Sequence, residues 1–260
     1  MSENKIKINR FELKNLRKHS KIGIVGKRAS GKSWVIASFL KYYENKCKIV
    51  ISPTNRFSEF FSSLNLYNLE IYHTCTDDLI KILLSNEKEE EIILVFDDCV
   101  SLSPSQNDLI RNNINKITLI VSAQSCKLLK DFCHFCEELD YVFCLKESVI
   151  KYQTEQWTSY FNIFPTFSSF KQVFSLLTEN YGVIVSDNGS NSNILQDVVF
   201  YYKVMKNAET QQIQEEIPEE KIEEKENIKN IENVENSENL HVNDSCIGTI
   251  YNLIKSYLCL

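Results

Sequence analysis

Four residues near the start of the chain have the types and the spacing that bind the phosphates of a nucleotide. Gly26, Gly31, Lys32 and Ser33 satisfy the pattern G-x-x-x-x-G-K-[ST] in full. Glycines at the two ends let the backbone approach phosphate oxygens, and the N–H groups of the loop form a concave nest for them. A lysine at this position reaches the β- and γ-phosphates, and the serine hydroxyl completes a Mg²⁺ shell. The stretch therefore predicts a P-loop that takes ATP and Mg²⁺.

The residues around this pattern fit a strand, a loop and a helix in that order. Ile22, Ile24 and Val25 form a β-branched run before the loop, and residues 33–43 carry mostly apolar helical faces. A structural glycine turn is the alternative, and the strand–loop–helix setting favours nucleotide binding. The expected nucleotide-binding residues are Gly26, Lys27, Arg28, Ala29, Ser30, Gly31, Lys32 and Ser33.

An acidic pair that ends an apolar run is the second candidate for chemistry. Residues 92–96 are Ile-Ile-Leu-Val-Phe, and Asp97 and Asp98 follow them. Such a run is typical of a central parallel strand whose carboxyl end enters an active site. In a P-loop enzyme Asp97 would hold Mg²⁺, directly or through water, and Asp98 would polarise the attacking water. A strand that ends in a solvated acidic turn is the alternative.

Gln124 lies near the end of the next predicted strand, residues 116–125. A glutamine at that point can donate a hydrogen bond to the γ-phosphate and accept one from the lytic water. Gln124 is therefore a candidate sensor of the γ-phosphate. An ordinary polar residue at a strand end is the alternative.

Strands and helices alternate along the first 206 residues, which predicts an α/β domain with a mainly parallel sheet and helices on both faces. Residues 1–20 are expected to form a lead-in strand or arm, and the last two strands a hairpin at a sheet edge. Further strands are expected at 46–52, 70–72, 141–145, 181–186 and 198–204, and further helices at 57–63, 76–84, 104–115, 127–139, 149–161 and 167–178.

Charge is unevenly distributed along the 260 residues. Residues 207–244 contain 12 acidic residues and 3 lysines, whereas residues 1–206 contain 25 basic and 23 acidic residues. A nearly neutral body neither requires nor excludes a nucleic-acid partner. We expect a P-loop ATPase domain over 1–206, a flexible acidic linker over 207–244 and a short amphipathic helix over 245–260. Whether that helix docks on its own chain, a second copy or another partner stays open.

Cysteines and apolar runs indicate the compartment. The 9 cysteines are scattered, no signal peptide is visible, and no apolar run reaches the roughly 18–20 residues that cross a bilayer. We expect a soluble protein of a reducing compartment without a membrane partner. Cys133 and Cys136 have C-x-x-C spacing but lack a second ligand pair. We therefore expect them to lie in a helix that packs in the core, and not in a metal or redox site. The aromatic residues of 157–170 are expected to pack in the core rather than stack on bases.

The ordered set of motifs resembles the DNA-packaging ATPases of large double-stranded DNA viruses, of the poxvirus and giant-virus type, within the FtsK-HerA superfamily. The resemblance covers about residues 15–204. The residues that carry it are 26–33, Ser-Pro-Thr at 52–54, residues 93–98, Arg111 followed by 119–124, residues 181–187 and residues 199–202.

The resemblance implies an ASCE-type P-loop core, with an extra strand between the P-loop strand and the strand before Asp97. It implies a homo-oligomeric ring that moves double-stranded DNA into a capsid, with a capsid or portal protein as partner. The location would be the cytoplasm of the infected cell, at the viral factory, or the virion. It further implies that a basic residue reaches the γ-phosphate of the next subunit. Arg111 is the best match, with Arg28 and Arg56 as alternatives.

One residue departs from the family pattern, since cellular members usually have Glu where this chain has Asp98. Aspartate is one methylene shorter, so the lytic water must sit closer or another group must help. A nucleotide-dependent adaptor with little hydrolysis therefore stays an alternative function. A small-molecule phosphotransferase is another, although no Arg-rich lid stretch follows. The expected catalytic residues are Lys32, Asp98, Gln124 and Arg111, and the expected Mg²⁺ ligands are Ser33 and Asp97.

Overall fold

The computed structural model describes residues 8–53, 55–84, 91–98, 102–132 and 139–204. Residues 207–244 and 245–260, and the pair Cys133 and Cys136, lie outside the described residues. The division into a domain, an acidic linker and a terminal helix therefore stays a prediction.

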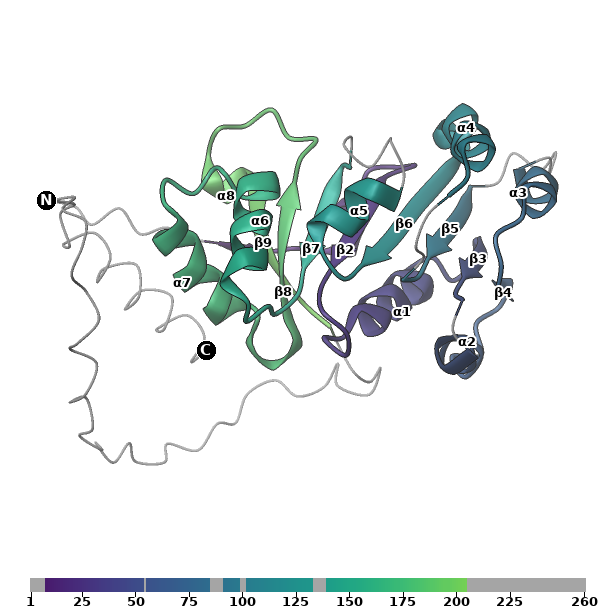
Figure 1. Ribbon diagram of the computed structural model, residues 1–260, viewed down its shortest axis with the longest axis horizontal. Helices are drawn as coiled ribbons and strands as arrows, with labels where there is room; N and C mark the ends of the chain where they lie inside the picture. The colour runs from purple at the N-terminus through teal and green to yellow at the C-terminus, as the bar shows by residue number, and fades with distance from the viewer. Residues whose placement is uncertain (1–7, 54, 85–90, 99–101, 133–138, 205–260) are drawn as a thin grey trace, which may run out of the picture.

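The described residues form one nine-stranded sheet in the order β1-β9-β8-β7-β2-β6-β5-β3-β4 (Figure 1). The strands are β1 (Asn9–Arg10), β2 (Lys21–Val25), β3 (Cys47–Ile51), β4 (Leu69–Tyr72), β5 (Ile92–Phe96), β6 (Ile117–Ala123), β7 (Tyr141–Cys144), β8 (Gly182–Asp187) and β9 (Val199–Lys203). The six strands from β7 to β4 are parallel, whereas β8 is antiparallel to β7 and to β9. The predicted mainly parallel sheet is confirmed. β6 lies between β2 and β5, which is the inserted strand of the ASCE type.

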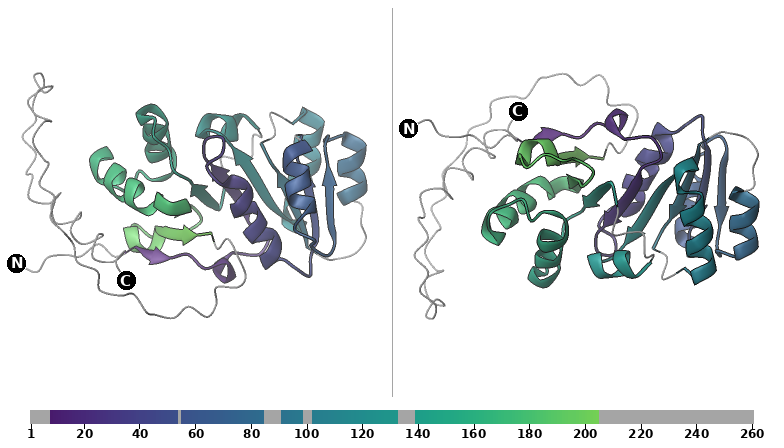
Figure 2. Two further views of the ribbon diagram at one scale, coloured as in Figure 1. Left: turned by 90° about the horizontal axis from the view of Figure 1, so that it is seen from below. Right: turned by 90° about the horizontal axis from the view of Figure 1, so that it is seen from above.

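Helices cover both faces of this sheet, as predicted (Figure 2). On one face, Val35 and Phe39 of α1 pack with Phe61 of α2. On the other face, the core includes Ile110 of α4 and Phe170 of α7. The helices are α1 (Lys32–Tyr42), α2 (Asn55–Ser62), α3 (Asp77–Leu84), α4 (Pro104–Asn112), α5 (Cys126–Phe132), α6 (Ile150–Tyr160), α7 (Phe167–Leu177) and α8 (Leu195–Val198), with 3₁₀ turns η1 (Leu13–Asn15), η2 (Ile114–Lys116) and η4 (Glu179–Tyr181).

Local sequence explains where the central elements begin. Every residue of β5 and β6 is buried, as expected for central parallel strands with both faces covered. Ser103 caps α4 in a reciprocal arrangement: its hydroxyl accepts a hydrogen bond from Gln106 N, and its own N–H donates to Gln106 Oε1. These elements fix the path from the end of β5 to the start of β6.

The edge beyond β8 differs from the prediction in one respect. β8 and β9 do form an antiparallel pair, but β9 is not the outermost strand, because β1 pairs with it in parallel. Phe11 anchors this lead-in arm: its N–H donates to Tyr201 O at 2.7 Å, and its buried ring contacts Tyr141. A two-residue strand is too short to show a period in the sequence, so the pairing could not be predicted.

The aromatic segment between α6 and α7 belongs to the core, which confirms the packing prediction. Phe161 and Phe170 are fully buried and stack with ring centroids 5.4 Å apart. Among the described helices, none is long and apolar enough to cross a membrane. Among the described residues, Cys75, Cys126 and Cys144 carry free thiols.

Candidate nucleotide-binding site

The carboxyl ends of neighbouring parallel strands bring the predicted site residues to one edge of the sheet. Val25 at the end of β2 pairs with Ala123 of β6, and Phe96 at the end of β5 pairs with Val121 of β6. The P-loop follows β2, and Asp97 follows β5. Both therefore leave the sheet at the same edge, two strands apart, which is where α/β proteins bind ligands.

The loop between β2 and α1 has the backbone that a phosphate nest requires. Gly31 has φ 107°, in the left-handed region, and lies directly before the first residue of α1. Ala29 also has a positive φ, 64°. A side chain at position 31 would be strained, which explains the glycine. Lys27, Arg28 and Ala29 are exposed, so the outer part of the loop is open to solvent.

Lys32 ties the loop to the acidic pair. Its side chain is only 6% exposed, and its ammonium group donates to Gly26 O at 2.9 Å and Lys27 O at 3.4 Å. The same Nζ lies 3.3 Å from Asp98 Oδ1. The P-loop lysine and the second aspartate therefore lie side by side at this edge of the sheet. The catalytic roles assigned to them stay predictions.

Asp97 is the buried member of the acidic pair, with 1% of its surface exposed. Ser122 on β6 donates its hydroxyl hydrogen bond to Asp97 Oδ1 at 2.8 Å. Burial raises the pKa of the Asp97 carboxyl from 3.8 to about 6; the Ser122 hydrogen bond opposes this shift, and the charge of Asp98 adds to it. A nearby cation would stabilise the charged form of a carboxylate in this setting.

The donor set fits Mg²⁺. Ser33 presents a hydroxyl from the first turn of α1, and Asp97 presents a buried carboxylate whose negative charge is disfavoured by burial. Oxygen donors of this kind are the ligands that Mg²⁺ prefers, and a divalent ion would offset the cost of the buried charge. The assignment of Ser33 and Asp97 as ligands stays a prediction.

Asp98 has an unusual backbone, with φ 51° in the left-handed region. Its N–H donates to Ser122 Oγ at 2.9 Å, and its side chain is 14% exposed. Aspartate adopts this conformation more readily than most residues with a Cβ. The backbone therefore gives a physical reason for Asp rather than Glu at this position.

Gln124 and Arg111 lie in different places. Gln124 is exposed and directly follows β6, at the same edge as Lys32. Arg111 is exposed in the last turn of α4. Because α4 returns from the end of β5 to the start of β6, this turn lies toward the amino ends of the strands. The structure brings Gln124 to the site and does not bring Arg111 to it. Arg28 lies in the exposed loop itself.

Ser122 is a site residue that the sequence analysis did not single out. It donates to Asp97 and accepts from the backbone of Asp98, so it orients both acids. Its only signal in the sequence is a polar side chain within the apolar run before Gln124. Recognising its partner required the register between β5 and β6.

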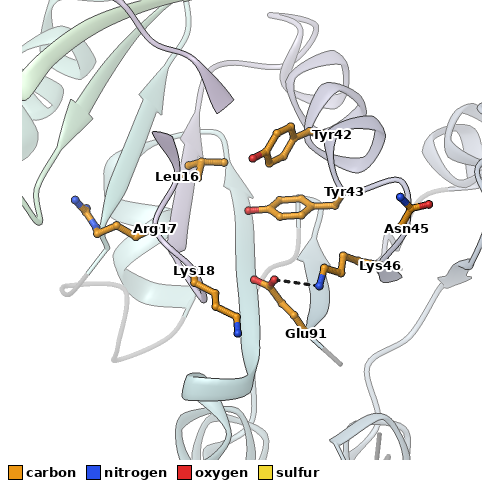
Figure 3. A pocket seen from close by; sticks show the side chains of 8 residues that line it. All are labelled: Leu16, Arg17, Lys18, Tyr42, Tyr43, Asn45, Lys46 and Glu91. Carbon is orange, nitrogen blue, oxygen red and sulfur yellow. Dashed lines mark ion pairs between the residues drawn. The ribbon is translucent and has the colours of Figure 1, made fainter. Parts of the chain in front are cut away.

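A hollow with a volume of about 400 Å³ lies at the opposite edge of the sheet from the P-loop (Figure 3). At its floor, buried Glu91 lies 3.8 Å from Lys46 Nζ and accepts a hydrogen bond from Thr118 at 2.6 Å. Burial, with the charge of Glu91 adding to it, raises the pKa of Tyr43 to about 12. The lining residues, Leu16, Arg17, Lys18, Tyr42, Tyr43, Asn45, Lys46 and Glu91, precede strand starts, so this hollow is separate from the P-loop site.

The strand order, the P-loop and the acidic pair define the fold of the ASCE-type P-loop NTPases. A solved structure with this fold is similar to the chain: the genome-packaging NTPase B204 from Sulfolobus turreted icosahedral virus 2 in complex with AMPPCP. The TM-score is 0.50 at 14% identity, over 73% of this chain and 100% of that chain. The resemblance to viral packaging ATPases is therefore confirmed at the level of the fold.

Two viral proteins are similar to the chain in sequence. An uncharacterized protein of Acanthamoeba polyphaga mimivirus is 25% identical over 227 residues, which are 78% of this chain and 79% of that protein. An uncharacterized protein of Invertebrate iridescent virus 3 is 26% identical over 202 residues, 71% of this chain and 75% of that protein. No protein-family model matches the chain.

The raised pKa of Asp97 predicts a pH dependence of Mg²⁺-nucleotide binding. Below about pH 6 the Asp97 carboxyl holds a proton that Mg²⁺ must displace. The affinity for Mg·AMPPCP should therefore fall as the pH drops below about 6, by up to about tenfold per pH unit, and level off above it. Calorimetric titration over roughly pH 5 to 8, a range that brackets the raised pKa, measures this dependence. The variant Asp97→Asn is the control for protonation of the nucleotide itself. An equal fall in affinity at low pH in that variant would contradict the assignment of Asp97 as the titrating group.

Removal of the Ser122 hydroxyl should impair the site without removing either acid. In Ser122→Ala, the Asp98 N–H loses its acceptor and Asp97 loses a donor that lowers its pKa. We expect about a 10- to 100-fold loss of Mg²⁺-nucleotide affinity or of ATP hydrolysis. The fall in affinity at low pH should also begin at a higher pH than in the wild type. Ser186→Ala removes an equally buried serine from β8 and is the matched control. Similar effects of the two variants would rule out a positioning role for Ser122.

Proposed function

We propose that the protein hydrolyses ATP with Mg²⁺ and uses the free energy to move double-stranded DNA, as the genome-packaging motor of a virus. The observation that carries the proposal is the 3.3 Å contact between Lys32 Nζ and Asp98 Oδ1. It joins the P-loop lysine and the strand-end acid in one site, on a fold shared with a viral genome-packaging NTPase. Sequence similarity to proteins of two viruses supports a viral role.

The roles of the site residues follow from their chemistry. Bound at Ser33 and Asp97, Mg²⁺ would neutralise charge on the β- and γ-phosphates. Lys32 would stabilise the negative charge that develops at the γ-phosphate, together with the N–H groups of the loop. Asp98 would accept the proton of the attacking water, and Gln124, exposed at the end of β6, would hydrogen bond to that water and the γ-phosphate.

Arg111 supports a homo-oligomeric arrangement. It is exposed and lies toward the sheet edge opposite its own P-loop, so it is available to a site on a neighbouring copy. We propose that Arg111 acts in trans within a ring, where an arginine adds positive charge at the transferred phosphoryl group. Double-stranded DNA is the proposed substrate that the motor moves, and a capsid or portal protein is the proposed docking partner.

Steady-state ATP hydrolysis tests this function. Long duplex DNA should stimulate hydrolysis by the full-length protein, and added salt should weaken the stimulation because phosphate contacts release counterions. Lys32→Ala should lower the turnover about 100- to 1,000-fold, since a charge at the γ-phosphate is lost. Asp98→Asn should lower it by about 100-fold or more while ATP binding is retained.

Lys41→Ala, at an exposed lysine on α1, is the control and should leave turnover unchanged. Full activity of Asp98→Asn would reject Asp98 as the base. ATP binding without hydrolysis under any condition would contradict the motor and favour a nucleotide-dependent adaptor. Transfer of the γ-phosphate to a small molecule would favour a phosphotransferase.

A further inference from the structure

Two partly exposed aromatic side chains lie beside the phosphate loop: Tyr181 before β8, and Trp34 on α1, whose ring also contacts Phe60 of α2. Tyr181 is 50% exposed and Trp34 is 38% exposed. With Ser30, Gly31, Leu145 and Val204 they line a narrow pocket of about 10 Å³. A ligand larger than water would therefore lie at its mouth, against the exposed parts of the two rings.

The strand order predicts the orientation of a nucleotide bound at this loop. Asp97 and Asp98 follow β5, on the β6 side of β2, whereas β7 and β8 lie on the other side. Cys144 at the end of β7 pairs with Ile184 near the start of antiparallel β8, so Tyr181 reaches the same sheet edge as the P-loop. If the γ-phosphate lies toward Asp98, as the proposed function requires, the nucleoside end extends toward β7 and Tyr181.

The turn before β8 holds Tyr181 in a fixed place. Asn180 and Tyr181 have φ 49° and 62°, left-handed values that cost energy in residues with a Cβ. Gly182 has no room for a side chain, because a Cβ there would lie 2.0 Å from Leu177 O. Tyr181 Cδ1 lies 3.4 Å from the place that a Cβ on Gly31 would occupy. The strained turn therefore sets the ring directly against the phosphate loop.

We propose that Tyr181, with Trp34 beside it, forms the surface on which the base of the bound nucleotide stacks. This inference rests on the proposed function, since it takes the orientation of the triphosphate from Asp98. Aromatic rings stack on any nucleobase, because every base has a π-face. Tyr181 thus provides affinity for the nucleoside part and discriminates little between adenine and guanine.

Comparison of two ligands separates base binding from phosphate binding. Affinities for Mg·ATP and for inorganic tripolyphosphate with Mg²⁺ are measured by calorimetric titration of the full-length protein and its variants. Tyr181→Leu should weaken ATP binding about 10-fold, as loss of one base–aromatic stack does, and leave tripolyphosphate binding within about twofold. Tyr181→Phe should retain the affinity for ATP. Tyr67→Leu, at a tyrosine 73% exposed before β4, is the matched control.

Equal losses for both ligands in Tyr181→Leu would overturn the inference, because the ring would then support the loop and not the base. An unchanged ATP affinity would overturn it as well. These outcomes leave the proposed function standing if the wild type hydrolyses ATP. A wild type that binds neither ligand, or in which Lys32→Ala has no effect on either, would instead overturn the proposed function and this inference with it.

Discussion

The contacts of the Lys32 ammonium group hold the candidate site together. The P-loop and the acidic pair come from strands that are not neighbours, since β6 lies between β2 and β5. Lys32 spans that gap with hydrogen bonds to the carbonyls of Gly26 and Lys27 and a 3.3 Å ion pair with Asp98. Because its side chain is almost fully buried, these contacts are poorly screened by water. A γ-phosphate would enter this network and share the lysine with Asp98.

Strand order then gives each part of a nucleotide its own environment. Toward β5 the edge carries carboxylates, with the Asp97 pKa raised by burial and so favourably placed for a cation. Toward β7 and β8 it carries the apolar side chain of Leu145 and the ring of Tyr181. The P-loop lies between these two environments. A ligand with a charged end and an aromatic end, such as a nucleoside triphosphate, matches that division.

The sequence predicted the parts of the site that depend on local order, and missed those that depend on register or backbone. The P-loop and the run before Asp97 are contiguous, so pattern and strand propensity were sufficient. Ser122 acts through a partner 25 residues away, which only the pairing of β5 with β6 shows. The left-handed φ values of Asp98 and Tyr181 are set by tertiary packing, and β1 is too short for any period. The α/β fold was predictable because each buried strand and each amphipathic helix is contiguous in the sequence, as the P-loop is, and because strands and helices alternate along the chain.

Translocation along DNA can be measured directly as displacement of a triplex-forming oligonucleotide from linear duplex DNA by the full-length protein. For a DNA-translocating motor, displacement should require hydrolysable ATP and Mg²⁺. The Asp98→Asn variant should give no displacement although it still binds ATP. Hydrolysis by the wild type without any displacement would contradict a DNA-translocating motor. Equal displacement by Asp98→Asn would contradict the chemistry assigned to the site.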